Sequence, residues 1–244
     1  MKTYVVNLEK STDRKKYMTR LLADQPFLDV EFINAVDGRN LSPQETENQF
    51  DCEKFLKHYM AKVRPGEIGC TLSHQKCYRN LLESNEKSVI IFEDDLIINE
   101  DFSPVLPLVK QWLDCEEPRV LLLSGWFWHT STKKFDSNHR LAQVVDGYLT
   151  HAYAINRAAA KIMVDDRPWY VADAWREFIS RGVKICGLRP HIFDQDWSGV
   201  FKTVVNDEEI AITQHRLKRW ISVKHRALRQ KLLSLTGRFE PAKA

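Results

Sequence analysis

Apolar and polar positions alternate in blocks over the first forty residues. Residues 3–8 form a short apolar run that is typical of a buried strand, and residues 30–36 form another. Between them, a polar segment at residues 11–13 can cap a helix, and apolar side chains recur at helical spacing over residues 17–22. This strand–helix–strand order predicts an α/β fold with parallel strand pairing.

The same patterning continues along the rest of the chain. Further helices are predicted at residues 52–60, 67–84, 106–112, 156–164 and 173–180, and further strands at residues 88–92, 119–123, 144–155 and 183–186. Residues 41–65 are polar and weakly patterned, and Gly147 interrupts the extended segment around it. No internal repeat or low-complexity linker divides the sequence. We therefore predict one domain over residues 1–213 and a C-terminal tail over residues 214–244.

Composition narrows the class of protein. Of the 244 residues, 43% are hydrophobic and 11% aromatic, enough for a sizeable core, and no apolar run reaches the length of a membrane span. The five cysteines are odd in number and include no CxxC pair, which argues for a reducing compartment and against a disulfide framework or a zinc site. The N-terminus begins directly on the first strand, without a secretory signal. We expect a cytoplasmic protein.

The tail from residue 214 onward differs from the body in charge. It holds nine Lys or Arg residues and one acid, a net charge of +8, whereas the remaining 213 residues carry −5. The apolar residues that fall along one helical stripe, with Trp220 at its edge, are Leu217, Ile221, Leu228, Leu232 and Leu235. Such a basic amphipathic helix favours an anionic membrane surface. The alternatives for the tail are a helix packed on the body and a disordered basic end. The absence of a recognised nucleic-acid-binding motif argues against nucleic acid as its partner.

Three consecutive acids follow the strand predicted at residues 88–92. Burying a charge is unfavourable unless it is paired or bound to a metal. Alternation along an extended chain places Glu93 and Asp95 on one face and Asp94 on the other. Two carboxylates on one face at a strand end form a hard-oxygen site suited to Mg²⁺ or Mn²⁺. On these residues alone, a metal site and a solvated acidic turn are both open.

Polar groups also follow the other predicted strands, and in open α/β folds ligands bind beyond the carboxyl ends of the strands. The groups after the four strands are Asn7, Leu8 and Arg14; Ala35 and Asp37; Glu93, Asp94 and Asp95; and Ser124, Gly125 and Trp126. An amide, a guanidinium and carboxylates with a cation can together hold a nucleoside diphosphate. No Walker-type glycine loop and no GxGxxG motif occurs, which disfavours a P-loop or a dinucleotide site.

Four motifs resemble those of glycosyltransferase family 25, which includes lipooligosaccharide galactosyltransferases of Gram-negative bacteria. They are residues 6–8 with Ser11, Asp13 and Arg14; residues 66–74, Gly-Glu-Ile-Gly-Cys-Thr-Leu-Ser-His; residues 90–95, Ile-Ile-Phe-Glu-Asp-Asp; and residues 151–155, His-Ala-Tyr-Ala-Ile. The third is similar to the DxD metal site of GT-A enzymes. The resemblance covers residues 3–200 and departs from the family's pattern at Leu149-Thr150, where Gly followed by Ser or Thr is usual.

This resemblance implies a single-domain GT-A-like α/β fold, with a Rossmann-like nucleotide-binding half and a mixed central sheet. It implies Asp95 as the direct ligand of Mn²⁺ or Mg²⁺, with Asp94 nearby and Glu93 either contacting the metal through water or holding the ribose. The candidates for a further protein ligand are His191, Asp194 and Asp196. The residues expected to contact the UDP-sugar donor are Asn7, Leu8, Arg14, Ala35, Asp37, Ser73, His74, Glu93 and Asp94.

The family is regarded as inverting, which implies a single displacement and one general base. Asp173, which lies among aromatic residues, is the candidate base, and Glu177 is the second candidate one helical turn on. A plain helix cap is an open alternative for Asp173, as is a satisfied, half-buried role for His74. Cys70 and Cys77 are interpreted as packing thiols.

The sequence and the resemblance together predict an inverting, metal-dependent glycosyltransferase that moves a hexose onto a growing saccharide. Galactose from UDP-galactose, and a lipooligosaccharide or other cell-surface glycan as acceptor, rest on the resemblance alone, and UDP-glucose is the alternative donor. A metal-dependent phosphohydrolase and a non-catalytic nucleotide-sugar-binding protein are the rivals from other classes. The tail would hold the enzyme peripherally on the inner face of the inner membrane of a Gram-negative bacterium.

Overall fold

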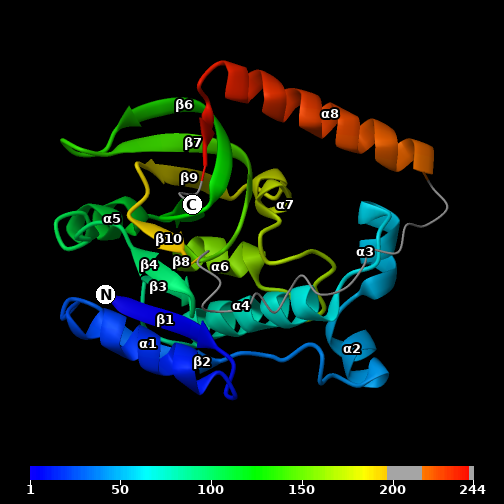
Figure 1. Cartoon of the computed structure of the whole chain (residues 1–244), viewed down its shortest axis with the longest axis horizontal. Helices are drawn as coiled ribbons and strands as arrows, with labels where there is room; N and C mark the ends of the chain where they lie inside the picture. Colours follow the sequence, from blue (N-terminus) through cyan, green and yellow to red (C-terminus); the bar gives the residue numbers. More distant parts are fainter. Residues whose placement is uncertain (197–215, 242–244) are drawn as a thin grey trace.

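A large mixed sheet forms the centre of the molecule (Figure 1). The computed structural model describes residues 1–196 and 216–241, and the sheet has nine strands within them. In sheet order they are β11 (Phe239–Glu240), β6 (Trp126–Lys134), β7 (Arg140–Tyr148), β9 (Lys184–Arg189), β5 (Arg119–Leu122), β8 (Ala152–Asn156), β3 (Ser88–Glu93), β1 (Lys2–Asn7) and β2 (Asp29–Asn34). Strand β1 pairs in parallel with β2 and β3, and β5 with β9, whereas the remaining neighbours are antiparallel. The predicted α/β fold with a mixed central sheet is therefore confirmed.

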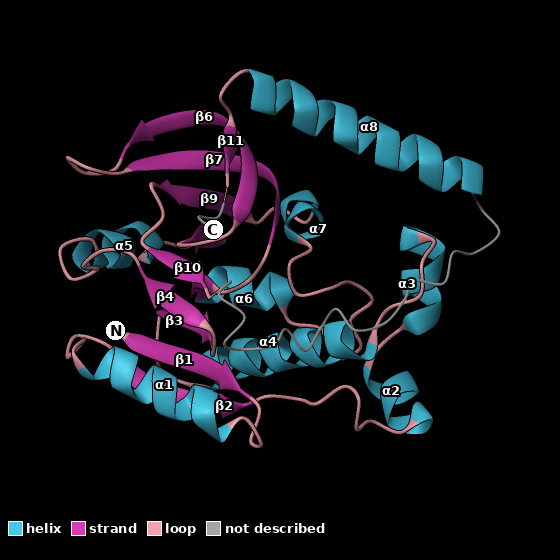
Figure 2. Cartoon of the chain, viewed as in Figure 1, coloured by secondary structure: helices cyan, strands magenta, loops and turns pink. Residues whose placement is uncertain are grey.

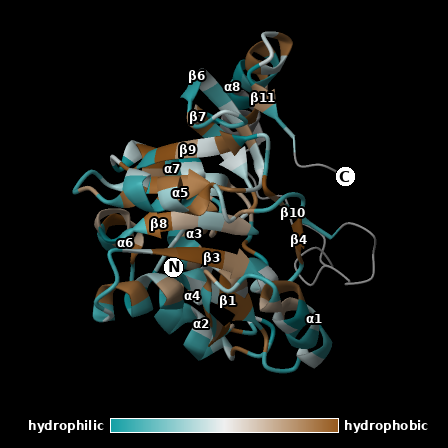
Figure 3. Cartoon of the chain, turned by 90° about the vertical axis from the view of Figure 1, so that its left-hand side faces the viewer, coloured by the Kyte–Doolittle hydropathy of each residue, from teal (hydrophilic) through white to brown (hydrophobic). Residues whose placement is uncertain are grey.

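Helices cover both faces of this sheet (Figure 2). They are α1 (Thr12–Ala23), α2 (Pro43–Gln49), α3 (Cys52–Tyr59), α4 (Pro65–Glu83), α5 (Leu106–Leu113), α6 (Arg157–Met163), α7 (Trp175–Ser180) and α8 (Arg216–Leu235). Alternate residues of β3 show how the core divides: Val89 and Ile91 pack with residues of α4, α6 and α7, whereas Ile90 and Phe92 pack with residues of α1 and α5. All four are fully buried, as expected for a strand covered on both faces, and the central strands are the most hydrophobic part of the chain in Figure 3.

Several predicted elements differ from the structure. The segment predicted as one strand over residues 144–155 is the end of β7 and the whole of β8, separated at Leu149, whose φ of 75° cannot continue a strand. Gly147 does not make this break, because it lies within β7. A Cβ at Gly147 would lie 3.0 Å from the carbonyl oxygen of Trp126 and 3.3 Å from side-chain atoms, so the glycine permits close packing instead.

Several further elements were missed or shifted. Helix α2 was missed because its residues are all polar and none of them is buried. Most of β6 was missed because its second half is exposed. Helix α7 begins at Trp175 with Ala174 as its N-cap, rather than at Asp173. A separate two-stranded sheet joins β4 (Leu96–Ile98) to β10 (Phe193–Gln195), and neither strand was predicted.

The C-terminal tail is attached to the body along the β6–β7 edge of the sheet (Figure 1). Strand β11 pairs with β6, and α8 lies along the same edge. The predicted boundary between residues 213 and 214 lies outside the described residues. Among the helices of residues 1–196 and 216–241, none is long and apolar enough to cross a bilayer.

Candidate active site

The carboxyl ends of the parallel strands β1, β2 and β3 meet at one edge of the sheet, and a pocket opens there. Its empty space, counted together with the open mouth, is about 790 Å³. We call it the acidic pocket. The predicted site residues that line it are Leu8, Arg14, Ala35, Asp37, Ser73, His74, Glu93, Asp94 and Asp95.

The three acids do not alternate as an extended chain would place them. Strand β3 ends at Glu93, and Asp94 and Asp95 form the turn into β4. All three carboxylates therefore line the same pocket, and the prediction that Asp94 faces the other way is wrong. The solvated acidic turn is also excluded, because Asp94 is 8% exposed and Asp95 is 6% exposed.

Asp94 is held by the two polar residues predicted after the first strand. Asn7 Nδ2 donates to Asp94 Oδ2 at 2.7 Å, and Arg14 donates to Asp94 Oδ1 at 2.7 Å. Burial raises the pKa of the Asp94 carboxyl, and the ion pair with Arg14 only partly offsets this. Asn7 and Arg14 thus fix the Asp94 carboxylate in the turn after β3.

Asp95 is held by a residue that the sequence did not indicate. Gln195 Nε2 donates to Asp95 Oδ2 at 2.9 Å, and His151 Nε2 lies 2.7 Å from Gln195 Oε1. Asp95 Oδ1 is buried and has no hydrogen-bond partner in the described structure. Burial and the neighbouring charge of Glu93 raise the pKa of Asp95. One buried carboxylate oxygen of a residue that lines the pocket therefore has unused hydrogen-bonding capacity.

Glu93 faces a chain of buried side chains on the opposite wall. Thr150 Oγ1 donates a short hydrogen bond to Glu93 Oε1, and His74 Nε2 lies 3.4 Å from the same oxygen. His74 Nδ1 is hydrogen-bonded to the Tyr153 hydroxyl at 2.7 Å. Burial alone would raise the pKa of Glu93, but its contacts with His74, His151 and Thr150 hold the pKa below its ordinary value. His74 is almost fully buried, rather than half-buried.

The start of α4 reaches the pocket because glycines allow it to approach the loop after β2. A Cβ at Gly69 would lie 2.5 Å from the carbonyl oxygen of Val36, so no larger residue fits there. Ser73 Oγ accepts from the Val36 N–H at 2.8 Å and donates to the Gly69 carbonyl at 2.6 Å. Ser73 therefore fixes the loop that carries Ala35 and Asp37 into the pocket.

The acidic pocket offers a divalent cation few protein ligands. Within residues 1–196 and 216–241, the three acids do not bring three ligand atoms within 4.8 Å of one another. Asp95 would therefore hold the cation through its unpartnered Oδ1, and Glu93 is the nearest further acid on the same wall. Mg²⁺ commonly uses one or two carboxylates and fills its other positions with water and substrate phosphates.

The three candidates for a further metal ligand have different surroundings. His191 does not line the pocket: its ring packs against Phe127, and its Nε2 lies 3.1 Å from the Pro241 carbonyl oxygen. Asp194 is buried, and its Oδ1 accepts from the Gln195 N–H at 3.0 Å. Asp196 donates its backbone N–H to the Asp95 carbonyl at 2.9 Å, so the backbones of these two residues are adjacent.

Asp173 is not among the residues that line the acidic pocket, and it lies two residues before the start of α7. Its Oδ2 accepts from the Leu149 N–H at 3.0 Å, so it does not act as the cap of α7. Burial raises the pKa of Asp173, the Leu149 N–H partly offsets this, and the charge of Glu93 raises the pKa further. Glu177 pairs instead with His58, whose Nε2 lies 3.2 Å from Glu177 Oε1.

Sequence reasoning missed several residues of the site. Arg39 and Cys70 line the acidic pocket, and Thr150 donates to Glu93. Cys70 lies inside the motif at residues 66–74, and Thr150 directly precedes the motif at residues 151–155, so the family resemblance could have indicated both residues. Gln195 carries no local signal, because it reaches Asp95 only through the pairing of β10 with β4.

Comparisons with known proteins agree with the motifs. Residues 1–173 match the model of glycosyltransferase family 25, described as LPS biosynthesis protein. A glycosyltransferase 25 family member of Aedes aegypti is 32% identical over 179 residues, covering 68% of this chain and 28% of that protein. Human procollagen galactosyltransferase 2 is 27% identical over 114 residues, covering 46% of this chain and 18% of that protein. The chain thus spans less than a third of the length of these relatives.

Among solved structures, the fold is similar to that of a Drosophila β-1,4-galactosyltransferase 7 mutant in complex with manganese, UDP-Gal and xylobiose. The TM-score is 0.38 and the sequence identity 12%, over 89% of this chain and 72% of that one.

Proposed function

The chain belongs to glycosyltransferase family 25, and we propose that it transfers galactose from UDP-galactose to a glycan hydroxyl with the help of a divalent cation. The observation that carries this proposal is the unpartnered Oδ1 of Asp95, buried among three carboxylates at the carboxyl edge of β1 and β3. The name of the human relative, a galactosyltransferase, supports galactose over glucose as the transferred sugar. UDP-glucose remains the alternative donor.

The donor would lie along the acidic pocket. Leu8 and Ala35 offer apolar walls for the nucleoside, and Asp37 lies beside them with its carboxylate paired to Lys10. Exposed Arg39 at the pocket edge offers a cation to the diphosphate. Arg14 is fixed against Asp94, so its charge also lies within the pocket wall.

Asp95, with Glu93 beside it, would hold the cation, which when bound supplies charge neutralisation to the departing diphosphate. The chain's own part is to keep this carboxylate in place. Gln195 holds Asp95 Oδ2, while Oδ1 has no partner in the described structure. Arg14 lies 3.5 Å from the same Oδ2 and balances part of the acidic charge. Burial keeps bulk water from competing for these groups.

Asp173 would take the proton from the acceptor hydroxyl in a single inverting displacement. Its raised pKa makes it a stronger base than an ordinary carboxylate. Its Oδ2 is fixed by the Leu149 N–H, which orients the carboxylate. Glu177 is less suited to this role, because its carboxylate pairs with His58.

The acceptor would be a lipid-linked glycan such as a lipooligosaccharide, reached from an anionic membrane surface on the cytoplasmic side. Helix α8 supports this part of the proposal. Leu228, Leu232 and Leu235 are 57–74% exposed, and they lie on the side of α8 that does not contact the body. Basic residues flank them along the same helix, as in helices that lie on anionic lipid.

Incubating the full chain with UDP-galactose, UDP-glucose, Mn²⁺ and a panel of glycans tests the proposal, with mass spectrometry of the glycans and assay of released UDP. We expect glycans to gain one hexose from UDP-galactose, with the β-anomeric product of an inverting enzyme. Release of free phosphate without glycan extension would support a phosphohydrolase. Retained UDP binding with no turnover on any acceptor would support a binding protein.

A further inference from the structure

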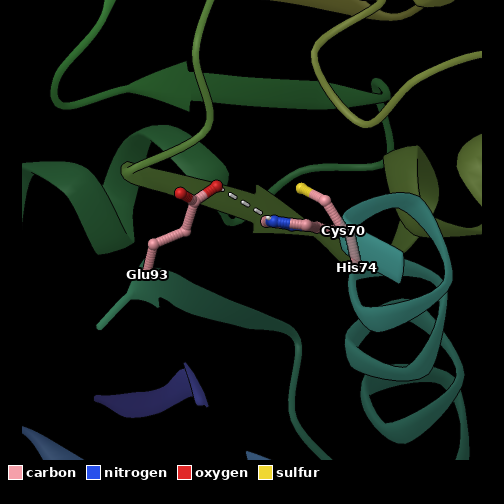
Figure 4. A group of neighbouring side chains, drawn as sticks. All are labelled: Cys70, His74 and Glu93. Carbon is pink, nitrogen blue, oxygen red and sulfur yellow. Dashed lines mark ion pairs between the residues drawn. The ribbon is translucent and has the colours of Figure 1, made fainter. Parts of the chain in front are cut away.

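Cys70, His74 and Glu93 form a second cluster of potential metal ligands inside the acidic pocket (Figure 4). Cys70 and His74 are four residues apart on α4 and therefore share one face of that helix. Glu93, at the end of β3, points at them from across the pocket (Figure 4). The Sγ, the imidazole nitrogen and a carboxylate oxygen all lie within 4.8 Å of one another. No other group of three such residues meets this distance in the described parts of the chain.

The chemistry of this cluster differs from that of Asp95. A thiolate and an imidazole select borderline-soft cations such as Zn²⁺ or Co²⁺, whereas carboxylates alone suit Mg²⁺ and Mn²⁺. Three protein ligands with one open position are typical of tetrahedral zinc sites that exchange water or substrate. Ligand atoms of such a site lie about 3.3–3.8 Å apart given metal–ligand distances of about 2.0–2.3 Å.

The surroundings of His74 already match those of a metal ligand. Its Nδ1 is hydrogen-bonded to the Tyr153 hydroxyl at 2.7 Å, and that hydroxyl lies 3.0 Å from the Tyr78 hydroxyl. Metal-bound histidines usually carry such an outer partner on the second ring nitrogen, which fixes the ring. His74 Nε2 is buried, lacks a hydrogen-bond partner in the described structure, and faces Glu93 Oε1 at 3.4 Å. A cation bound there would give His74 Nε2 the partner that it lacks.

We propose that Cys70, His74 and Glu93 bind a borderline-soft divalent cation such as Zn²⁺, at a site that shares Glu93 with the carboxylate site at Asp95 but takes its other two ligands from α4. On binding, the Cys70 thiol releases its proton to solvent and the thiolate becomes a ligand. Burial raises the pKa of this thiol, so the thiolate forms only when the cation is there to compensate its charge. The absence of a CxxC pair is no obstacle, since the helix and the strand supply the ligands together.

Metal binding can be tested without any enzymatic readout. Chelator-treated protein is titrated with Co²⁺ and its absorption spectrum recorded, and the affinity for Zn²⁺ is measured by competition with a fluorescent chelator. We expect one bound ion and a near-ultraviolet thiolate-to-cobalt band. Cys70→Ala should abolish the band and lower the affinity for Zn²⁺ by more than the roughly 10–100-fold that loss of an outer-shell partner costs.

Matched variants separate this site from its neighbours. Cys77→Ala removes a thiol from the same helix that lies in the core, and it should leave the spectrum unchanged. Tyr153→Phe removes only the outer partner of His74, so the affinity should fall by roughly 10–100-fold with the band retained. Asp95→Asn should leave the band in place. A cobalt spectrum without a thiolate band, or an unchanged affinity in Cys70→Ala, would overturn the proposal.

Because Glu93 lines the donor pocket, Zn²⁺ at this site is also expected to inhibit transfer. This consequence rests on the proposed function, whereas the binding does not. If Zn²⁺ binds but no glycan is extended under any condition, the transferase proposal fails while the metal site stands. Transfer that is inhibited equally in the parent and in Cys70→Ala would place the inhibitory ion elsewhere and overturn only the inhibition.

Discussion

The acidic pocket and helix α8 use their charged side chains in opposite ways. In the pocket, buried acids pair with Asn7, Arg14 and Gln195, and one oxygen of Asp95 is left without a partner. On α8, Arg226 is fully used within the chain, because its guanidinium binds both oxygens of Asp146 at 2.6 and 2.7 Å. The exposed side of α8 carries Leu228, Leu232 and Leu235 beside exposed basic residues. The pocket therefore keeps polar capacity for a ligand, and α8 keeps hydrophobic surface.

This contrast predicts that substitutions in the pocket affect chemistry, whereas substitutions at the inner face of α8 affect stability. Asp95→Asn should lower transfer by at least about 10³-fold, because it removes the carboxylate that would hold the cation. Its free energy of unfolding at neutral pH should be unchanged or slightly higher. Burial raises the pKa of Asp95, so its ionised form is disfavoured in the folded state.

Steady-state kinetics and urea unfolding of the same preparation check both halves of this prediction. Asp166→Asn is the matched control, since that carboxylate is fully exposed and lies outside the pocket. Near-normal transfer by Asp95→Asn would remove Asp95 from the metal role. A large loss of stability would instead show that its partners matter only for the fold.

Asp173 lies between the two regions, because the charges of both Glu93 and Arg226 act on it. Asp173→Asn should lower turnover by about 10²-fold or more while leaving the affinity for UDP-galactose unchanged. Asn keeps an oxygen that can accept from the Leu149 N–H, so the local structure is preserved. In the parent, the rate should rise with pH as Asp173 loses its proton, and the raised pKa places this limb above the usual range of a carboxyl.

The comparison variant for Asp173 is Glu177→Gln, since both acids were candidates for the base. Glu177 pairs with His58, so its loss should change turnover only slightly and leave the acid limb in place. If Glu177→Gln abolishes the limb and Asp173→Asn does not, the two roles are reversed.

Substitution on the inner face of α8, the side that contacts the body, should lower stability instead of transfer activity. Arg226→Ala leaves Asp146, which is 5% exposed, buried without its cation and removes a guanidinium that lies over the Tyr148 ring. The free energy of unfolding should fall by about 2–3 kcal/mol, less than for a fully buried pair because Arg226 is one-third exposed. Urea unfolding measures this, and exposed Arg229→Ala on the same helix is the control. An effect equal to that of Arg229→Ala would show that the pair contributes nothing.

The sequence predicted the residues of the acidic pocket better than the contacts between α8 and the body, and the reasons are physical. Strands β1 and β3 are buried on both faces, so their short apolar runs and the polar groups after them stand out locally. The inward face of α8 is polar, and its partner Asp146 lies 80 residues earlier in the chain. Apolar periodicity therefore identified the exposed stripe of α8 and could not identify the packed one. Gln195 was missed for the same reason, because its partner Asp95 is 100 residues away.

Leu149 shows a second limit of local patterns. It departs from the usual glycine of the family motif, yet its φ of 75° is the left-handed conformation that favours glycine. Asp173 accepts from its N–H, and Trp175 Nε1 donates to its carbonyl at 3.0 Å, so its neighbours hold the strained backbone. Leu149 thus adopts a conformation that favours glycine, although the residue there is leucine.

The strain at Leu149 predicts a difference of about 1 kcal/mol in the free energy of unfolding between two substitutions. Leu149→Gly should be more stable than Leu149→Ala by about that amount, because both remove the side chain and only glycine relieves the positive φ. Thermal unfolding of the two variants side by side measures the difference. Equal stabilities would indicate that the turn carries no strain, and Asp173 would then lose its support as an oriented carboxylate.

The smallest effect on stability is expected on the outer face of α8, where the consequence should appear in binding instead. Leu228 is 58% and Leu232 is 57% exposed, so replacing both with Ser should change the free energy of unfolding by less than about 0.5 kcal/mol. The same change should weaken co-sedimentation with anionic vesicles, because the apolar stripe would provide the insertion energy. Transfer to a soluble acceptor should stay unchanged, since neither residue lines the acidic pocket. Unchanged vesicle binding would refute the membrane role of α8, whereas a large loss of stability would show that the leucines pack on the body and would remove the contrast between its two faces.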